Sequence, residues 1–212
     1  MYKKYFKRTI DVVLALILLV IFFVPCVIVA IAIKLDSKGP VFADAPMRVG
    51  QFGTLFKMFK FRSMIVNAHH IIRTDPKYKE LFEQFKNNSF KLNNDPRVTS
   101  VGKWIRKYSL DEVPQLLNVI RGEMSIVGPR AYYSDELDHQ SVKFPEVKSA
   151  IDRVLAVKPG ITGLWQVSGR SEVNFDKRIL IDAEYVHHMS LKKDMIILFK
   201  TPFVMISGRG AS

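Results

Sequence analysis

The most prominent pattern in the sequence is a long uncharged stretch near its start. From Val12 to Ile33, about 22 consecutive residues carry no charge. As a helix this stretch would be roughly 33 Å long, enough to cross the roughly 30 Å hydrocarbon core of a bilayer. It is long for the apolar part of a signal peptide, and no small-residue cleavage site follows it. The pattern therefore predicts a membrane-embedded helix.

Basic residues flank this apolar stretch on both sides. Those before it are Lys3, Lys4, Lys7 and Arg8, and those after it are Lys34, Lys38 and Arg48. Because basic residues near membrane helices tend to stay on the cytoplasmic side, a helix that enters, bends and returns would keep both groups there. Pro25 gives a physical cause for a bend, since it lacks an N–H and clashes with the preceding turn. Transmembrane helices also tolerate proline, so a single-pass helix is the alternative.

The rest of the chain has short apolar periods that predict an α+β domain, mainly helical, with a small β-hairpin. The hairpin is expected within 40–64, where Gly50 and Gly53 mark a turn. Helices are expected over 67–91, 101–108, 114–120, 175–188 and 191–206. Gly122 is expected to end the helix over 114–120. The helix over 191–206 is amphipathic, and it either packs on the core or lies at the membrane interface.

Two parts are therefore expected: a membrane-embedded segment over 1–38 and one integrated, cytosol-facing catalytic domain over 39–212. The formal net charge of +12 changes the picture by requiring an anionic partner. Nucleic acid, a phosphorylated substrate and an acidic membrane surface all fit that requirement. The only cysteine, Cys26, lies in the apolar stretch, so the chain has no internal disulfide and suits a reducing compartment.

The candidate chemistry lies at two adjacent acids, Asp111 and Glu112. Ser109 and Glu112 have the spacing of a capping box, which would place both acids near a helix N-terminus, although Pro114 leaves the register open. Acids at a helix start are usually caps. Nearby basic residues favour a functional role instead, because they could hold a diphosphate beside a carboxylate. These residues are Arg106, Lys107, Arg121 and Arg130.

Paired acids support two kinds of chemistry. They can hold Mg²⁺, which bridges carboxylates to phosphate oxygens, and an aspartate can itself attack phosphorus. No serine stands in a nucleophile-elbow pattern that would offer a rival nucleophile. The pairs His69–His70 and His187–His188 lack zinc spacing, and Gly50 and Gly53 make no P-loop.

Taken together, these motifs resemble the bacterial sugar transferase family, the monotopic polyprenyl-phosphate phosphoglycosyl transferases. The resemblance covers nearly the whole chain, and its specificity comes from the order of the motifs. They are the basic-flanked apolar segment with Pro25, Lys60–Met64, Asp95–Thr99, Arg106, Ser109–Leu116, Asn118–Val119, Gly122–Arg130 and Lys158–Arg170.

The resemblance implies a covalent mechanism in two steps. Asp111 would attack the β-phosphorus of a UDP-sugar and release UMP, and polyprenyl phosphate would then accept the sugar phosphate. Glu112, with Asp111, would hold Mg²⁺. The resemblance also implies a re-entrant helix broken at Pro25, contact with anionic lipids, and a catalytic domain on the cytoplasmic face of the inner membrane. Phosphate or substrate binding would fall to Lys60, Arg62, Arg106 and Arg130.

The chain departs from the family pattern at two places. Val24 precedes Pro25 where many members have serine, and Ala131 follows Arg130 where many have proline. An extra N-terminal membrane domain found in larger relatives is not expected, so the chain resembles a minimal catalytic form. The 158–170 stretch and the Arg209–Ala211 tail look like those of relatives that transfer galactose or glucose phosphate.

Two other classes of function remain as alternatives. A membrane-tethered protein that binds nucleic acid or another anionic polymer would explain the charge and the anchor, but it would not need Asp111 or Glu112. The family resemblance argues against a nucleic-acid partner. A membrane-bound phosphohydrolase would use the same aspartyl-phosphate chemistry and release sugar phosphate to water.

Overall fold

The computed structural model describes residues 2, 6–87, 92, 95–169 and 173–207. Lys3, Lys4, Arg170 and the Arg209–Ala211 tail lie outside the described residues. The elements in order are α1 (Lys7–Ile21), α2 (Phe23–Asp36), β1 (Arg48–Val49), η2 (Gln51–Gly53), β2 (Leu55–Phe56), α3 (Ala68–Thr74), η3 (Pro76–Tyr78), α4 (Lys79–Asn87), α5 (Ser100–Lys107), η4 (Leu110–Gln115), α6 (Leu116–Arg121), β3 (Ser125–Val127), α7 (Ser134–Lys143), η5 (Pro145–Val147), α8 (Lys148–Leu155), β4 (Gly160–Thr162), α9 (Leu164–Val167), α10 (Phe175–His187) and α11 (Leu191–Ser207).

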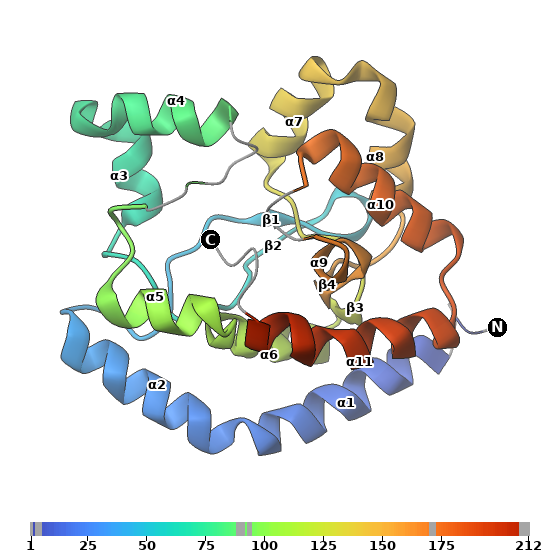
Figure 1. Ribbon diagram of the computed structural model, residues 1–212, viewed down its shortest axis with the longest axis horizontal. Coiled ribbons are helices and arrows are strands. Elements are labelled where there is room, and N and C mark those ends of the chain that lie inside the picture. The colour runs from blue at the N-terminus through green and yellow to red at the C-terminus, as the bar shows by residue number, and fades with distance from the viewer. Residues whose placement is uncertain (1, 3–5, 88–91, 93–94, 170–172, 208–212) are drawn as a thin grey trace.

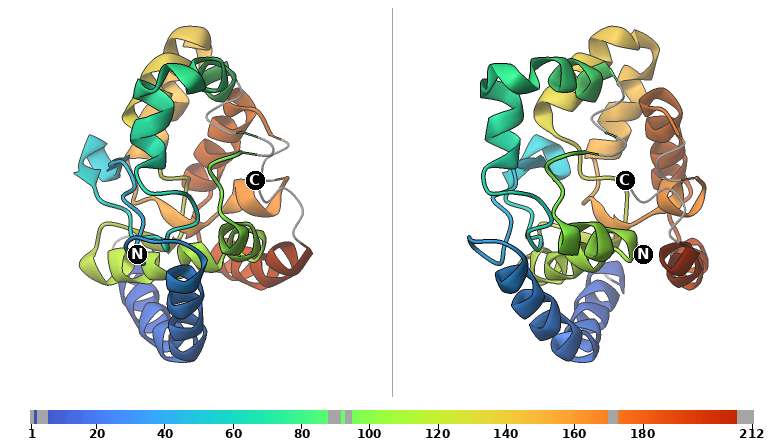
Figure 2. Two further views of the ribbon diagram at one scale, coloured as in Figure 1. Left: turned by 90° about the vertical axis from the view of Figure 1, so that its left-hand side faces the viewer. Right: turned by 60° about the vertical axis from the view of Figure 1, so that its left-hand side comes forward.

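The described elements are mostly helices, and they form layers (Figure 1). The α1–α2 pair runs along one side of the molecule, and α5, α6 and α11 lie next to it. α1 packs on α6 and β3, whereas α2 packs on α5 and η4. The α3–α4 and α7–α8 helices lie on the opposite side, with the β1–β2 hairpin between the two sides (Figure 2).

The apolar stretch forms two helices rather than one straight helix. No single described helix is long and apolar enough to span a bilayer, but α1 and α2 together have the required length and composition, and they meet at a bend of 61°. The bend lies at Phe22, three residues before Pro25. A proline clashes with the carbonyl four residues before it, here that of Ile21, so a break at this point is physically expected.

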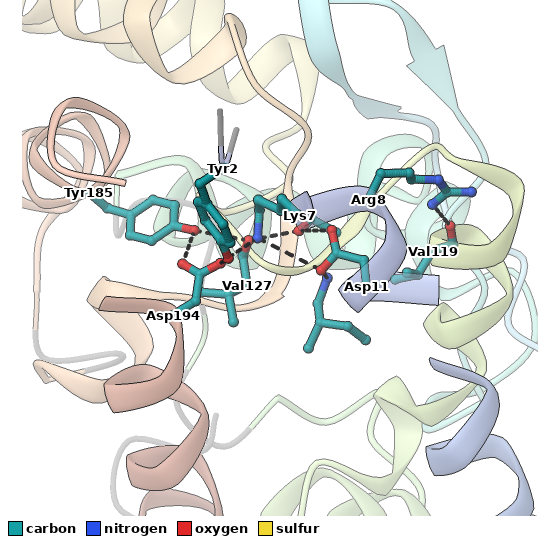
Figure 3. Close-up of polar contacts among 10 residues, drawn as sticks. Tyr2, Lys7, Arg8, Asp11, Val119, Val127, Tyr185 and Asp194 are labelled. Carbon is teal, nitrogen blue, oxygen red and sulfur yellow. Dashed lines mark hydrogen bonds and ion pairs between the residues drawn. The ribbon is translucent and has the colours of Figure 1, made fainter. Parts of the chain in front are cut away.

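A buried polar cluster fixes the start of α1 to the core (Figure 3). Asp11 accepts hydrogen bonds from the Ser125 hydroxyl (2.7 Å) and the Ile126 N–H (3.0 Å), both in β3. The Lys7 ammonium lies 2.7 Å from Asp194 of α11 and 3.8 Å from Asp11. Tyr185 donates a hydrogen bond to Asp194 at 2.7 Å. α1 is thereby attached to two elements far away in the sequence.

Tyr2 and Arg8 extend the same attachment. The Tyr2 hydroxyl donates to Asp194, and the Arg8 guanidinium donates to the backbone carbonyls of Val119 and Ile120 at the end of α6. Arg8 thereby contacts the carbonyl end of α6, where a cation is favourable. Gly122 follows with φ 83°, so the predicted end of this helix is confirmed.

Arg62 fixes the other end of the helix pair. Its guanidinium is buried and donates five hydrogen bonds within residues 33–40, four of them to backbone carbonyls and one to the Ser37 hydroxyl. Arg62 therefore holds the turn that follows α2. Both ends of the bent pair contact the same folded core.

The predicted β-hairpin is confirmed but is shorter than expected. β1 and β2 pair antiparallel with Arg48 opposite Phe56, and an isolated bridge joins Phe42 to Phe61. A second pair was not predicted: β3 runs parallel to β4, with Ser125 opposite Gly160. Each strand of this pair has only three residues, which is too short for an alternating pattern to show in the sequence.

Two local predictions are corrected. The single helix expected over 67–91 is two helices, α3 and α4, because Asp75 and Pro76 interrupt it with a short 3₁₀ turn that the Asp75 side chain caps. The capping box is wrong: Ser109 has φ 54° and its side chain makes no capping hydrogen bond. Pro114 lies inside the short 3₁₀ helix η4 that carries the acids.

The buried cluster at α1 generates a stability prediction. Asp194→Asn removes the charge that pairs with the buried Lys7 ammonium, and we expect a loss of about 3 kcal/mol in the free energy of unfolding. Denaturant unfolding in detergent micelles measures this loss. Glu184→Gln is the control, because its pair with Lys193 is 3.5 Å apart with Glu184 60% exposed, and such surface pairs contribute less than about 1 kcal/mol. Equal losses in the two variants contradict the prediction.

Candidate active site

The two adjacent acids lie in a cavity of about 270 Å³. Its walls come from η4, from the segment after β2, from the segment after β3 and from α9. It is lined by both acids and by four of the basic residues predicted to bind phosphate or substrate, namely Lys60, Arg62, Arg106, Asp111, Glu112 and Arg130. Lys107 and Arg121, also predicted as possible diphosphate contacts, are not among its lining residues.

Lys60 bridges the two acids. Its ammonium lies 2.8 Å from the Glu112 carboxylate and 3.7 Å from that of Asp111. Asp111 is buried, whereas Glu112 is partly exposed. Burial raises the pKa of the Asp111 carboxyl above its ordinary value, and the neighbouring Lys60 ammonium opposes that rise. The result is a desolvated carboxylate that a cation stabilises.

Backbone contacts hold Lys60 against the acids. The Phe61 N–H donates to the backbone carbonyl of Asp111 at 3.0 Å. In α6, the fully buried Asn118 side chain accepts a hydrogen bond from the Phe59 N–H (2.9 Å) and donates one to the Lys57 carbonyl (2.9 Å). The segment that carries Lys60 is therefore attached to η4 and α6 on both sides of the lysine. Asn118 belongs to one of the motifs of the family resemblance, but this role of its side chain was not predicted.

Two glycines allow the loops that carry Arg130 and Trp165 to meet. A Cβ on Gly160 would lie 2.1 Å from the Gly128 backbone nitrogen, so only glycine fits at this contact. The Gly160 N–H in turn donates to the Pro129 carbonyl at 2.8 Å. The Arg130 guanidinium then lies 5.2 Å from the Trp165 ring, within the range of a cation–π contact.

Asp182 of α10 supports the loop that carries Arg130. One oxygen of its fully buried carboxyl accepts from the Arg130 N–H and from the Tyr132 hydroxyl, both at 3.0 Å. The other oxygen has no hydrogen-bond partner in the described part of the chain. Burial raises the pKa of Asp182 to about 7. Sequence reasoning missed this residue, because nothing local marks it as different from other helix acids.

The remaining arginines of the cavity differ in how they are used. Arg97 forms a two-pronged pair with Asp95, at 2.8 and 2.6 Å. The Arg62 guanidinium donates its hydrogen bonds to the 33–40 segment, so its place in the fold is explained without a substrate, and its predicted role in binding stays a prediction.

His69 also lines the cavity. Burial together with the nearby Arg48 lowers the pKa of His69 to about 3, so the ring is neutral.

The acid pair fits a magnesium ion that the substrate helps to hold. No group of three or more His, Cys, Asp or Glu side chains among the described residues is arranged to bind a metal ion. Mg²⁺ is usually bound by one or two carboxylates, with waters and phosphate oxygens completing its shell. Asp111 and Glu112, which already share one cation in Lys60, are a donor set of this kind.

Comparison with known proteins gives the family. The family model described as bacterial sugar transferase matches residues 2–208. The chain belongs to the bacterial sugar transferase family. The resemblance drawn from the motifs is thereby confirmed.

Individual members of the family are similar along nearly the whole chain. The chain is 41% identical over 212 residues to the undecaprenyl-phosphate galactose phosphotransferase of Salmonella typhimurium, covering 98% of this chain and 42% of that protein. It is 40% identical over 205 residues to the exopolysaccharide production protein ExoY of Sinorhizobium fredii, covering 97% and 87%. It is 40% identical over 206 residues to the UDP-glucose:undecaprenyl-phosphate glucose-1-phosphate transferase of Escherichia coli, covering 93% and 39%. The chain thus spans less than half the length of several of the curated relatives it matches.

The raised pKa of Asp182 predicts how stability changes with pH. The folded protein keeps a proton on Asp182 between about pH 4 and 7 that the unfolded chain has lost, so stability falls as pH rises through this window. Asp182→Asn cannot titrate but still offers an oxygen to Arg130 and Tyr132. Wild type should lose on the order of 4 kcal/mol relative to this variant across the window.

Thermal unfolding midpoints at several pH values measure this difference. Asp138→Asn, at an exposed position of α7, is the control and should follow the wild-type profile. Parallel profiles for wild type and Asp182→Asn refute the account of Asp182.

Proposed function

We propose that this protein transfers a hexose-1-phosphate from a UDP-hexose to polyprenyl phosphate, with Asp111 as the nucleophile. The observation that carries the proposal is the buried Asp111 beside Glu112 and Lys60, in a cavity lined by arginines. The names of the relatives support the reaction, because they specify undecaprenyl phosphate with galactose or glucose. Undecaprenyl phosphate is therefore the acceptor to test first.

In the first step, an Asp111 oxygen attacks the β-phosphorus of the UDP-hexose. The new bond joins Asp111 to that phosphorus, and the bond to the oxygen shared with the α-phosphate breaks. UMP leaves with the electron pair, so no proton has to be supplied. Lys60 and the cavity arginines stabilise the charge that develops on the phosphate oxygens, which is the largest contribution in this kind of chemistry.

In the second step, a phosphate oxygen of polyprenyl phosphate attacks the same phosphorus. The bond to Asp111 breaks, the carboxylate is restored, and the product is a polyprenyl diphosphate hexose. Burial of Asp111 suits both steps, because a desolvated carboxylate is a better nucleophile and the excluded water cannot hydrolyse the intermediate. When Mg²⁺ is bound, Asp111 and Glu112 would hold it, and it would neutralise phosphate charge.

The apolar helix pair brings this site to the acceptor. Exposed apolar side chains gather on α1 and α2, and others lie on α5 and α11. They include Leu16, Val20, Phe23, Ile28, Leu35, Trp104, Phe199 and Phe203. Surfaces of this kind bind membranes. Both ends of the pair contact one folded core, and a core cannot lie on both sides of a bilayer, which supports a helix pair that enters and leaves on the cytoplasmic face.

Asp111→Asn tests the nucleophile. The change is nearly isosteric, so the protein should fold while turnover falls on the order of 10⁴-fold or more. Wild type incubated with a UDP-hexose and Mg²⁺, without acceptor, should release one UMP per site. Mass spectrometry should then find a hexose-phosphate adduct on Asp111.

Asp44→Asn is the control, since Asp44 is an exposed acid at the rim of the same cavity. Turnover retained in Asp111→Asn refutes the assignment of the nucleophile. Free hexose phosphate formed at the full rate of UMP release indicates a phosphohydrolase instead of a transferase.

The topology is tested with single cysteines in a Cys26→Ser background. Phe6→Cys and Lys38→Cys place exposed thiols before α1 and after α2. If the pair enters and returns, a membrane-impermeant thiol reagent should label neither position in intact cells and both positions in opened cells. Labelling of residue 6 from outside shows a spanning helix.

A further inference from the structure

Arg48, at the start of the hairpin, is the one arginine among the described residues lining the cavity that lies outside the sequence motifs. Its side chain is 6% exposed and lines the cavity that holds Asp111. The guanidinium lies 3.2 Å from the centre of the Tyr133 ring and donates to the Ala131 carbonyl at 3.1 Å. These two contacts fix the plane of the guanidinium. Nothing in them neutralises its charge.

Other buried arginines of this protein show what neutralisation looks like. Arg97 pairs with Asp95, and Arg178 pairs with Glu136 at 2.7 Å. Arg48 forms no ion pair with any acid in the described part of the chain, and its buried Nε there has no hydrogen-bond partner. Burying a charge without an opposite charge is costly unless its donors are hydrogen-bonded, as those of Arg62 are. An anionic ligand in the cavity would supply the opposite charge to Arg48.

The hairpin places Arg48 beside Arg130. The Val49 N–H donates to the Tyr132 carbonyl at 2.9 Å, and Arg48 itself bonds to Ala131, so β1 lies along the segment that follows Arg130. Arg130 also forms no ion pair among the described residues, and its Nε is buried without a hydrogen-bond partner. Two arginines with unused donors therefore line one cavity, which is the arrangement that a diphosphate requires.

The position of β1 distinguishes the two substrates. The β1–β2 hairpin lies on the far side of α5 and α6 from the α1–α2 pair (Figures 1 and 2). η4, with the acids, contacts α2. A lipid acceptor approaches from the side of the helix pair, and a water-soluble donor reaches the cavity from the other side.

We propose that Arg48 binds the nucleotide-side phosphate of the donor, the group that leaves as UMP. This inference rests on the proposed function and assigns one further residue to it. A guanidinium held flat on Tyr133 presents its donors to the phosphate without losing side-chain freedom on binding. Stabilising the leaving phosphate assists the first step and leaves the attack by the acceptor unaffected.

Titration with UMP, followed by calorimetry on the full chain in detergent with Mg²⁺, tests Arg48 without turnover. Arg48→Gln should weaken UMP binding roughly 10- to 100-fold, the usual loss for charge-assisted hydrogen bonds. Arg48→Lys keeps the charge, is the safer variant for folding, and should lose less. Arg153→Gln, an exposed arginine of α8, is the control and should bind UMP as wild type does.

Steady-state kinetics distinguish the two phosphates. The kcat/KM for the UDP-hexose should fall in Arg48→Gln while the kcat/KM for undecaprenyl phosphate stays at its wild-type value, because each ratio reports one half of a two-step reaction. Unchanged UMP binding in both Arg48 variants overturns the proposal, as does a fall in the acceptor kcat/KM alone or in both ratios equally. If wild type itself does not turn over but binds UMP through Arg48, the proposed function fails and the assignment of Arg48 stands.

Discussion

The attachment of the bent helix pair to the core is the constraint on which the other features depend. Asp11 binds the backbone and a hydroxyl of β3 at one end, and Arg62 binds the turn after α2 at the other. β3 continues directly into the loop of Arg130, and Arg62 is two residues from Lys60. The contacts that hold the apolar helices therefore also hold the two walls of the cavity. In the proposed membrane-bound state, these buried polar contacts would set the depth of the active site relative to the bilayer.

Charge is arranged in the cavity so that only part of it is neutralised by the protein. Arg97 is matched by Asp95, and Lys60 is matched by the acid pair. Arg48 and Arg130 line the same cavity without an ion pair in the described part of the chain. A cavity with unneutralised cations attracts a phosphorylated ligand, and Lys60 and Arg106 oppose the rise that burial causes in the pKa of the Asp111 carboxyl. Two of the basic residues behind the net positive charge are thus located in the cavity.

The sequence predicted those features that depend on neighbouring residues. The helices now seen as α5, α10 and α11 follow from their apolar periodicity, and Gly122 ends α6 because glycine adopts positive φ without cost. What escaped prediction depends on residues far apart in the chain. The contact of Gly128 with Gly160 joins two segments that separately look like loops. Arg48 differs from the buried Arg97 and Arg178 in forming no ion pair within the described part of the chain. Asp111, Glu112 and the phosphate contacts implied by the family resemblance do share one cavity. They could be predicted because each belongs to a motif on which the resemblance rests.

The short 3₁₀ helix explains how two adjacent acids can have different tasks. Successive residues on a 3₁₀ helix point about 120° apart, since three residues complete a turn. Asp111 accordingly lies buried behind Lys60, whereas Glu112 is partly exposed and takes the shorter contact with the ammonium. A regular helix beginning at Ser109 would have made both residues caps, with their carboxylates on backbone N–H groups. The positive φ of Ser109 and the proline at position 114 prevent that arrangement, and they leave the Asp111 carboxylate available for the proposed attack while Glu112 stays accessible to the proposed Mg²⁺.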